Sequence, residues 1–300
     1  MRWWKLGAGL LALVVMACGG TTAVEESRAQ GQLSLPLVTA GADGKTYRLV
    51  GATFEITGPQ TVTLTDTSAT AETVQTALTV GDYAVKLGGS WHLEAKDAPG
   101  TAVPAQLLSP NPLPFSVDKD QISEVRFLFK LRGSGTAEVG IQVDGGGWLA
   151  GSFHFTALDP AAPTSAFTDL VGKDVPFVIS FATSTVQKDG PQSVYVQTGP
   201  TVVQFGGPYS PTLARVAKGL AGSKLYFGLR AQGGTISFIG TDLFNMGYRI
   251  QLSPTPFAPG AVDADGRPDL TSFTFKTEGG LRDMSGGDGV KGTVDMNGSN

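Results

Sequence analysis

The stretch Val125-Arg-Phe-Leu-Phe-Lys-Leu131 carries the pattern from which the fold can be predicted. Its apolar residues recur at every second position, and Arg126 and Lys130 fall between them. Successive side chains of a β-strand point to opposite sides, so a period of two predicts a strand with one buried and one solvated face. Leu128 is the exception, because it stands among the residues predicted to face solvent.

The same alternation recurs along most of the chain. It is clearest in four further sets: Val62 and Leu64; Tyr83, Val85 and Leu87; Val139, Ile141 and Val143; Phe177, Ile179 and Phe181. The chain has 41 Gly and 18 Pro in 300 residues, and only 16% of its residues are charged, which indicates many turns and few solvated helices. We therefore predict an all-β protein of antiparallel β-sandwich units. Short helical turns are predicted at residues 164–171 and 210–220, the second with Ser210 as cap and Pro211 at the first helical position.

Several short strings occur twice, at nearly constant spacing. Residues 108–112 (LSPNP) recur at 252–256 (LSPTP), and residues 127–130 (FLFK) recur at 273–276 (FTFK). This order predicts two related units, each ending in a strand with two inward Phe side chains. The alternative is that turn chemistry alone recruits the same residues in any β protein rich in Gly and Pro.

These patterns give a predicted domain organisation. Residues 1–17 form a signal peptide and residues 18–40 a flexible tether, because the latter are small, polar and unpatterned. The first β-sandwich unit covers residues 41–132. The second covers residues 133–300, with a repeat core at 195–276, extra strands before it and a Gly-rich tail at 279–300.

In the first unit, residues 54–59 (FEITGP) and 78–85 (LTVGDYAV) resemble carboxypeptidase-regulatory, transthyretin-like and Cna-B-like β-sandwich domains. In those families L-x-x-G-x-Y-x-V marks the strand after a glycine turn. The resemblance covers fewer than 100 residues and implies a spacer, adhesion or binding module without catalytic residues.

The N-terminus has the features of an export signal. Arg2 and Lys5 precede an apolar run, Leu6 to Met16, that is too short to span a bilayer of about 30 Å. The run ends in Val15-Met-Ala-Cys18, which resembles the lipobox of bacterial lipoproteins. The resemblance implies cleavage before Cys18, acylation of that cysteine and a membrane as partner. Gly19 as the next residue favours the outer membrane. The alternative is an ordinary secretory peptide that happens to contain a cysteine.

Composition excludes some classes of partner. The formal net charge is −4, and loss of Arg2 and Lys5 with the signal makes it more negative, so nucleic acid is not expected as a partner. Cys18 is the only cysteine, which rules out an intramolecular disulfide.

Two histidines, His92 and His154, are the only candidates for acid–base chemistry by a ring nitrogen. Each stands between apolar residues of an alternating stretch, so both are predicted to face solvent without a serine or carboxylate partner. No G-x-S-x-G motif accompanies either one, and no H-x-x-x-H spacing supports zinc. We therefore predict no catalytic residues.

One acidic turn has the composition of a cation site. Asp263, Asp265 and Asp269, with Gly266, resemble the calcium loops of FG-GAP and dockerin-like repeats, in which alternate carboxylates converge on the ion. Ala261 occupies the first ligand position, and the matching stretch at 118–122 has no glycine. A plain turn before the last strand is the alternative to bound calcium.

Trp91 and Trp148 are the tryptophans that remain after signal removal. If exposed they could stack on sugar rings, whereas burial would make them anchors of a sandwich core. The leading prediction for the whole chain is a non-enzymatic, lipid-anchored envelope protein serving in binding, adhesion or assembly, with an envelope protein or polysaccharide as partner. The alternatives are a carbohydrate- or calcium-binding module and a secreted hydrolase.

Overall fold

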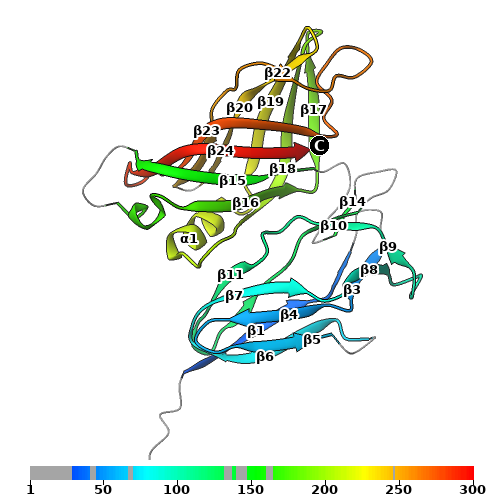
Figure 1. The fold of residues 1–300 in the computed structure, drawn as a ribbon, viewed down its shortest axis with the longest axis vertical. Helices are drawn as coiled ribbons and strands as arrows, with labels where there is room; N and C mark the ends of the chain where they lie inside the picture. Colours follow the sequence, from blue (N-terminus) through cyan, green and yellow to red (C-terminus); the bar gives the residue numbers. More distant parts are fainter. Residues whose placement is uncertain are drawn as a thin grey trace, which may run out of the picture.

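A computed structural model describes residues 29–40, 45–66, 70–131, 137–139, 147–159, 165–245 and 247–300. The protein is nearly all β, with 61% strand and 5% helix. This confirms the predicted all-β fold with several sheets in sandwich-like units. The elements form a first domain (residues 30–139) and a second domain (residues 147–300), which lie one beyond the other along the long axis (Figure 1).

The first domain consists of four small sheets around one core. One sheet has the order β12 (Ile122–Glu124), β1 (Gln30–Pro36), β6 (Thr73–Thr79). The next has the order β11 (Leu113–Val117), β7 (Gly81–Gly88), β4 (Thr53–Thr57), β5 (Val62–Thr65). The third has the order β2 (Val38–Ala40), β3 (Thr46–Val50), β8 (His92–Ala95), β9 (Ala102–Val103). The last has the order β10 (Ala105–Leu107), β13 (Phe129–Leu131), β14 (Ala137–Val139). β1 and β12 run parallel, and the other pairings of these sheets are antiparallel.

Alternating side chains build the core of this domain. Tyr83, Val85 and Leu87 of β7 are buried, as their spacing predicts. Phe127 and Phe129 are also buried, although regular strand structure begins only at Phe129. The period of two therefore predicted the buried face correctly and the length of the strand wrongly.

The predicted tether at residues 18–40 is wrong from Gln30 onward. Residues 30–36 form β1, which pairs along its full length with β6, and Leu33 and Leu35 are fully or almost fully buried. The alternation Leu33-Ser34-Leu35 is compatible with a strand, but three residues are too few to distinguish a strand from an unpatterned tether. The unit predicted at 41–132 likewise extends on both sides, since β1 precedes it and β14 pairs with β13 beyond residue 132. The predicted signal peptide and the start of the tether lie outside the described residues.

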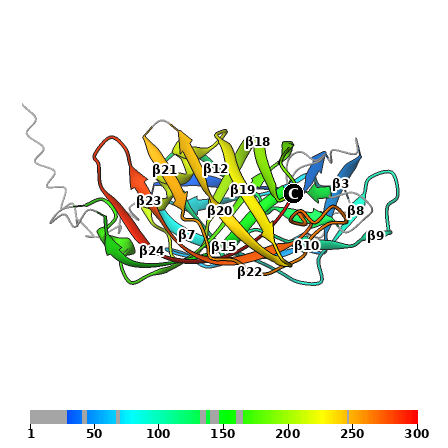
Figure 2. The same ribbon diagram turned by 90° about the horizontal axis from the view of Figure 1, so that it is seen from above.

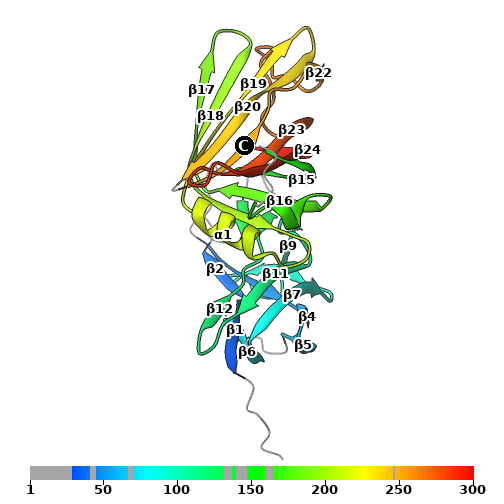
Figure 3. The ribbon, with the colours of Figure 1, turned by 90° about the vertical axis from the view of Figure 1, so that its left-hand side faces the viewer.

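The second domain is one sheet that closes on itself. Its ring contains, in spatial order, β16 (Asp174–Phe181), β15 (Gly147–Leu158), β24 (Gly289–Ser299), β23 (Phe273–Asp283), β21 (Tyr248–Leu252), β20 (Thr235–Asn245), β19 (Lys224–Gln232) and β18 (Ser193–Phe205). Residues 201–205 of β18 pair with β16 and complete the ring. β17 (Ser184–Asp189) pairs with the first half of β18, and β22 (Ala258–Pro259) pairs with β20. The strands extend beyond the ring as the hairpins at the top of Figure 3.

Phenylalanines fill the interior of the ring, and a helix covers its lower end. Phe153 and Phe177 of neighbouring strands pack with ring centroids 4.7 Å apart. Helix α1 (Pro211–Leu220) buries Leu213, Val216 and Leu220, which recur at helical spacing, against this core (Figure 3). Its predicted cap and first residue are confirmed: the Ser210 hydroxyl accepts from the Leu213 N–H at 3.2 Å. The first predicted helical turn is a 3₁₀ turn, η1 (Thr168–Leu170).

The predicted Gly-rich tail at 279–300 is part of the closed sheet. Residues 279–283 end β23, and β24 lies between β23 and β15, paired with both along most of its length. The predicted repeat core at 195–276 therefore ends in the middle of a strand.

The predicted duplication is not supported by the strand orders. Gly233 and Gly234 form the turn of the β19–β20 hairpin. A second Gly-Gly pair, Gly88 and Gly89, precedes them at nearly the same spacing as the repeated strings, but it lies at the end of β7 and leads to β8, which belongs to a different sheet. The paired Phe side chains of both F-x-F-K strings are buried, as predicted, but the two domains do not share a strand order. Turn chemistry explains the recurring strings.

The two domains touch through the end of the ring that carries Trp148. Gln204 of β18 accepts a hydrogen bond from the Ser109 hydroxyl at 2.7 Å and donates to the Arg126 carbonyl at 2.9 Å. The Lys130 ammonium lies 5.3 Å from the centre of the Trp148 ring. Leu128 stands between these contacts and is 4% exposed, which explains why a residue on the predicted solvent face is buried. Figure 2 shows the two domains from above, with the ring in front.

Candidate functional site

A polar hollow lies on the outer face of the second domain, across β15, β24, β23 and β21. Its volume is about 450 Å³. Polar and charged side chains line it from all four strands and from the ends that follow them: Thr156, Asp159, Gln251, Ser253, Glu278, Arg282, Lys291 and Thr293. We call this feature the polar groove.

Glycines form the floor of the polar groove. Gly279 and Gly280 of β23 lie beside Gly292 of β24. A Cβ atom at Gly280 would overlap the Val290 carbonyl oxygen, and one at Gly292 would overlap the His154 carbonyl oxygen. The missing side chains thus permit a close approach of three strands.

Paired charges stand at one end of the groove. The Asp159 carboxylate accepts from the Arg282 guanidinium and lies 3.5 Å from the Lys291 ammonium. The hydrogen bond from Arg282, with a further contribution from Lys291, holds the pKa of Asp159 below its usual value. Asp159 is therefore favoured in its ionised form, and the cationic side chains of Arg282 and Lys291 both lie against its carboxylate.

His154 lies on the same face, next to the groove on β15. Its Nδ1 is 2.7 Å from Asp174 Oδ1, and its Nε2 is 3.1 Å from Asp295 Oδ2. The hydrogen bond with Asp174 is the largest cause that raises the pKa of His154, and that with Asp295 adds to it. The prediction of a histidine without a carboxylate partner is wrong here. Cross-strand pairing of His154 with Asp174, which the sequence does not display, produces the contact.

This arrangement fits a charge bridge better than a catalytic dyad. A general base needs one ring nitrogen free to accept the proton of a nucleophile. Both nitrogens of His154 face carboxylates, so the ring is positioned to donate from both sides. The Lys276 ammonium, 3.4 Å from Asp295, adds a second cation.

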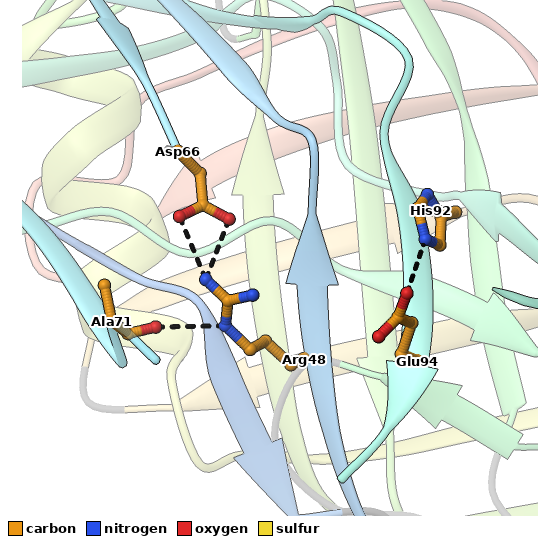
Figure 4. Close-up of polar contacts among 5 residues, drawn as sticks. All are labelled: Arg48, Asp66, Ala71, His92 and Glu94. Atoms are coloured by element: carbon orange, nitrogen blue, oxygen red, sulfur yellow. Dashed lines mark hydrogen bonds and ion pairs between the residues drawn. The ribbon is translucent and has the colours of Figure 1, made fainter. Parts of the chain in front are cut away.

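His92 also has a carboxylate partner, on the first domain (Figure 4). Its Nε2 lies 2.8 Å from Glu94 Oε1, and the other oxygen of Glu94 accepts from the Gly100 N–H at 2.9 Å. The Gly100 hydrogen bond is the main cause that lowers the pKa of Glu94, followed by the bond with His92. The contact again corrects the prediction of an isolated ring. It arises because residues 92 and 94 share one face of β8.

A buried ion pair lies beside this contact. One nitrogen of the Arg48 guanidinium is 2.9 Å from both oxygens of Asp66, and its Nε donates to the Ala71 carbonyl at 3.1 Å (Figure 4). The side chains are 10% and 2% exposed. The pair joins β3 to the segment that follows β5, so its setting is structural.

The three carboxylates of the predicted calcium loop are each engaged in the turn. Asp263 accepts from the N–H groups of Asp265 and Arg267, and Asp269 accepts from the Thr271 N–H at 2.8 Å. Asp265 instead pairs with the Arg267 guanidinium at 2.6 Å. Within the described ranges, no group of three His, Cys, Asp or Glu side chains is placed to hold a metal ion. Calcium binding stays a prediction.

The two tryptophans are packed against protein. Trp148 is 8% exposed, beneath Lys130. Trp91 is half-buried, with its ring 5.1 Å from that of Phe129. The burial of Trp148 fits an anchor of the packing, whereas stacking of a ligand on Trp91 stays a prediction.

Cys18 lies outside the described residues. In the part of the chain that the structure does describe, no helix has the length and apolarity needed to cross a membrane.

Comparison with known proteins gave no further guide. No protein-family profile, curated protein or solved structure matched the chain.

Sequence reasoning missed the polar groove. Its residues come from β15 and, about 90 or more positions later, from β21, β23 and β24, and the predicted glycine-rich tail covers β24 and the end of β23. The stretch Lys276-Thr-Glu-Gly-Gly280 was the sequence feature that could have indicated it, because Lys276 and Glu278 stand at alternate positions just before two glycines.

Proposed function

We propose that the protein is a non-enzymatic, lipid-anchored protein of the bacterial envelope that binds an envelope ligand in the polar groove. The observation that carries the proposal is the groove itself, a concave surface of about 450 Å³ lined by charged and polar side chains on a closed sheet. A rigid scaffold that presents convergent polar groups is the usual setting of a binding site.

The position of the groove is consistent with an anchor at Cys18. The start of β1 lies at the end of the first domain that is remote from the second domain (Figures 1 and 3). Eleven residues lie between Cys18 and Gln30, so the chain between them can extend over at most about 40 Å. A lipid on Cys18 would therefore hold the first domain near the bilayer and present the second domain away from it.

The histidine contacts support binding over catalysis. The His154 ring nitrogens both face carboxylates, and its pKa is raised, so the ring favours the charged form that cannot accept a proton. The proposal therefore assigns no catalytic residue.

The anchor is tested by metabolic labelling with a fatty acid. We expect label on the wild-type protein and none on Cys18→Ala, which should also be released from membranes in a folded form. An unlabelled wild-type protein would contradict the lipid anchor without affecting the groove.

The groove is tested in the full chain carrying Cys18→Ala, so that lipid does not mediate retention. Thr293→Arg places a long cation in the groove from an exposed strand position. We expect binding to washed envelopes of the producing bacterium to fall at least about tenfold, as for loss of roughly 1.4 kcal/mol. The matched control is Thr63→Arg, at an exposed position of β5 in the first domain, which should bind as before. Equal binding by both variants would reject the groove as the binding site.

A further inference from the structure

Two tyrosines lie side by side on the outer face of the second domain, outside the polar groove. The rings of Tyr195 on β18 and Tyr226 on β19 are nearly parallel, with an interplanar angle of 12° and centroids 5.7 Å apart. Tyr226 is 49% exposed. Most large aromatic side chains of this domain are buried in the ring, whereas Tyr195 is half-buried and Tyr226 is exposed on its outer face, so packing of the core does not explain the pair.

A glycine makes room for the pair. Tyr195 pairs across the strands with Gly228, and a Cβ atom at Gly228 would come within 2.7 Å of the Tyr195 ring. The ring therefore lies across β19 where any other residue would displace it. The result is an aromatic surface lying against the sheet.

The register of the strands leads from this pair directly into the polar groove. Tyr226 pairs with Asp242, Asp242 with Gln251, Gln251 with Gly280, and Gly280 with Lys291. Neighbouring strands are about 4.8 Å apart, so the row spans about 19 Å from Tyr226 to Lys291. The strands of this row are β19, β20, β21, β23 and β24 (Figure 2).

The charges along the row are balanced. The Asp242 carboxylate accepts two hydrogen bonds from the Arg249 guanidinium, at 2.8 and 2.7 Å. Asp159 is matched by Arg282 and Lys291, and Glu278 adds one more anion. Three acidic and three basic side chains leave no net charge to attract a polyanion or a polycation.

Resting on the function proposed above, we propose that the ligand is an uncharged polysaccharide of the envelope. One sugar ring lies on the Tyr195–Tyr226 pair, and the following sugars run along the row into the groove. The aromatic face contacts the C–H groups of the sugar, while the paired carboxylates, guanidinium groups and the Gln251 amide exchange hydrogen bonds with its hydroxyls. An elongated site with an aromatic end, a polar end and no net charge matches this chemistry better than a peptide or an acidic glycan.

The first experiment identifies the chemistry of the ligand. Polysaccharide is released from envelopes of the producing bacterium by exhaustive protease treatment and separated into uncharged and acidic fractions by anion exchange. We expect the Cys18→Ala protein to bind the uncharged fraction and to lose this binding after periodate oxidation of its vicinal diols. Binding to the acidic fraction alone, or binding that survives periodate, would overturn the proposal, as would loss of all binding upon protease treatment.

The second experiment tests the tyrosine pair. We expect Tyr226→Ala to weaken binding of the uncharged fraction about tenfold, and Tyr226→Phe to keep it within about threefold because the ring face is retained. Phe244→Ala is the matched control, since Phe244 is 55% exposed on the neighbouring strand but pairs with Arg249, off the row. Equal losses from Tyr226→Ala and Phe244→Ala would exclude a specific aromatic subsite.

The two proposals fail in different ways. If Thr293→Arg abolishes envelope binding but Tyr226→Ala does not, the groove stands and the tyrosine subsite is wrong. If neither variant reduces binding to envelopes, the groove itself is not the site.

Discussion

At the scale of single residues, the buried Arg48–Asp66 pair is the contact with the largest expected effect on stability. Removing one partner of a buried ion pair leaves an uncompensated charge away from water, which costs about 3 kcal/mol or more. We expect Asp66→Ala to lower the free energy of unfolding by about this amount, measured by urea denaturation at neutral pH. Arg48→Met combined with Asp66→Leu should lose less than Asp66→Ala alone, because no charge remains buried.

The control for this prediction is an exposed pair of the same domain. Lys86 and Glu55 lie 3.2 Å apart with side chains 56% and 51% exposed, so solvent screens their attraction. Glu55→Ala should change the free energy of unfolding by less than about 1 kcal/mol. Equal losses from Asp66→Ala and Glu55→Ala would show that the burial of Asp66 has no energetic consequence.

His154 makes the stability of the second domain depend on pH. Its folded-state pKa is raised above the ordinary 6.5, so its contribution is fully present below that value and is lost as the pH rises through the folded pKa. We expect His154→Gln to destabilise the protein at about pH 5.5 and to have little effect at high pH. Unfolding measured at several pH values checks the sign.

The two carboxylates differ in how strongly each raises the pKa of His154, and this difference gives a sharper test of the same bridge. Asp174 is the larger cause of the raised pKa, so Asp174→Asn should lower the pKa of His154 more than Asp295→Asn. An NMR titration of the His154 ring protons in the two variants distinguishes them. A larger fall in the pKa of His154 in Asp295→Asn than in Asp174→Asn would mean that Asp295 is the stronger partner.

At the scale of elements, α1 depends on its cap. The Ser210 hydroxyl accepts from the Leu213 N–H and donates to Asp169, so it joins the start of the helix to η1. We expect Ser210→Ala to cost about 1 kcal/mol in unfolding free energy, and Ser210→Thr to cost less because it keeps the acceptor. Urea denaturation of the two variants checks this, and equal losses would show that packing at Ser210, not its hydroxyl, matters.

Elements also show how far the sequence could predict this fold. The cap of α1 and the buried faces of the strands around Tyr83 and Phe129 follow local rules, and local rules predicted them. β24 did not look like a strand, because its glycines remove the alternation that marks one. Those glycines serve tertiary contact: a Cβ atom at Gly289 or Gly292 would overlap a carbonyl oxygen of the neighbouring strand, and one at Gly298 would overlap the side chains of Leu149 and Phe273. The polar groove could not be predicted for a related reason, because Gly279, Gly280 and Gly292 line it and its other residues are brought together only by strand register.

At the scale of the whole molecule, the junction between the domains decides whether they act as one body. Trp148 lies on the outside of the ring yet is 8% exposed, and Gln204 bridges Ser109 and Arg126 of the first domain. The Ser109 hydroxyl in turn accepts from the Leu128 N–H at 2.7 Å. Removing one member of a buried hydrogen-bond network costs free energy, because the remaining polar groups are left without partners. We therefore infer that the two domains are coupled in unfolding.

The chain offers a direct measurement of this coupling, since Trp91 reports on the first domain and Trp148 on the junction. With the signal sequence removed, Trp148→Phe leaves fluorescence from Trp91, and Trp91→Phe leaves fluorescence from Trp148. In these backgrounds we expect coincident unfolding curves, which is the test of a single cooperative transition.

Gln204→Ala should separate the two curves, because Ser109 and the Arg126 carbonyl lose their shared partner. Gln187→Ala, an exposed glutamine of β17 away from the junction, should leave them coincident. If the curves differ already in the parent proteins, the domains unfold independently, and the second domain can move relative to the first.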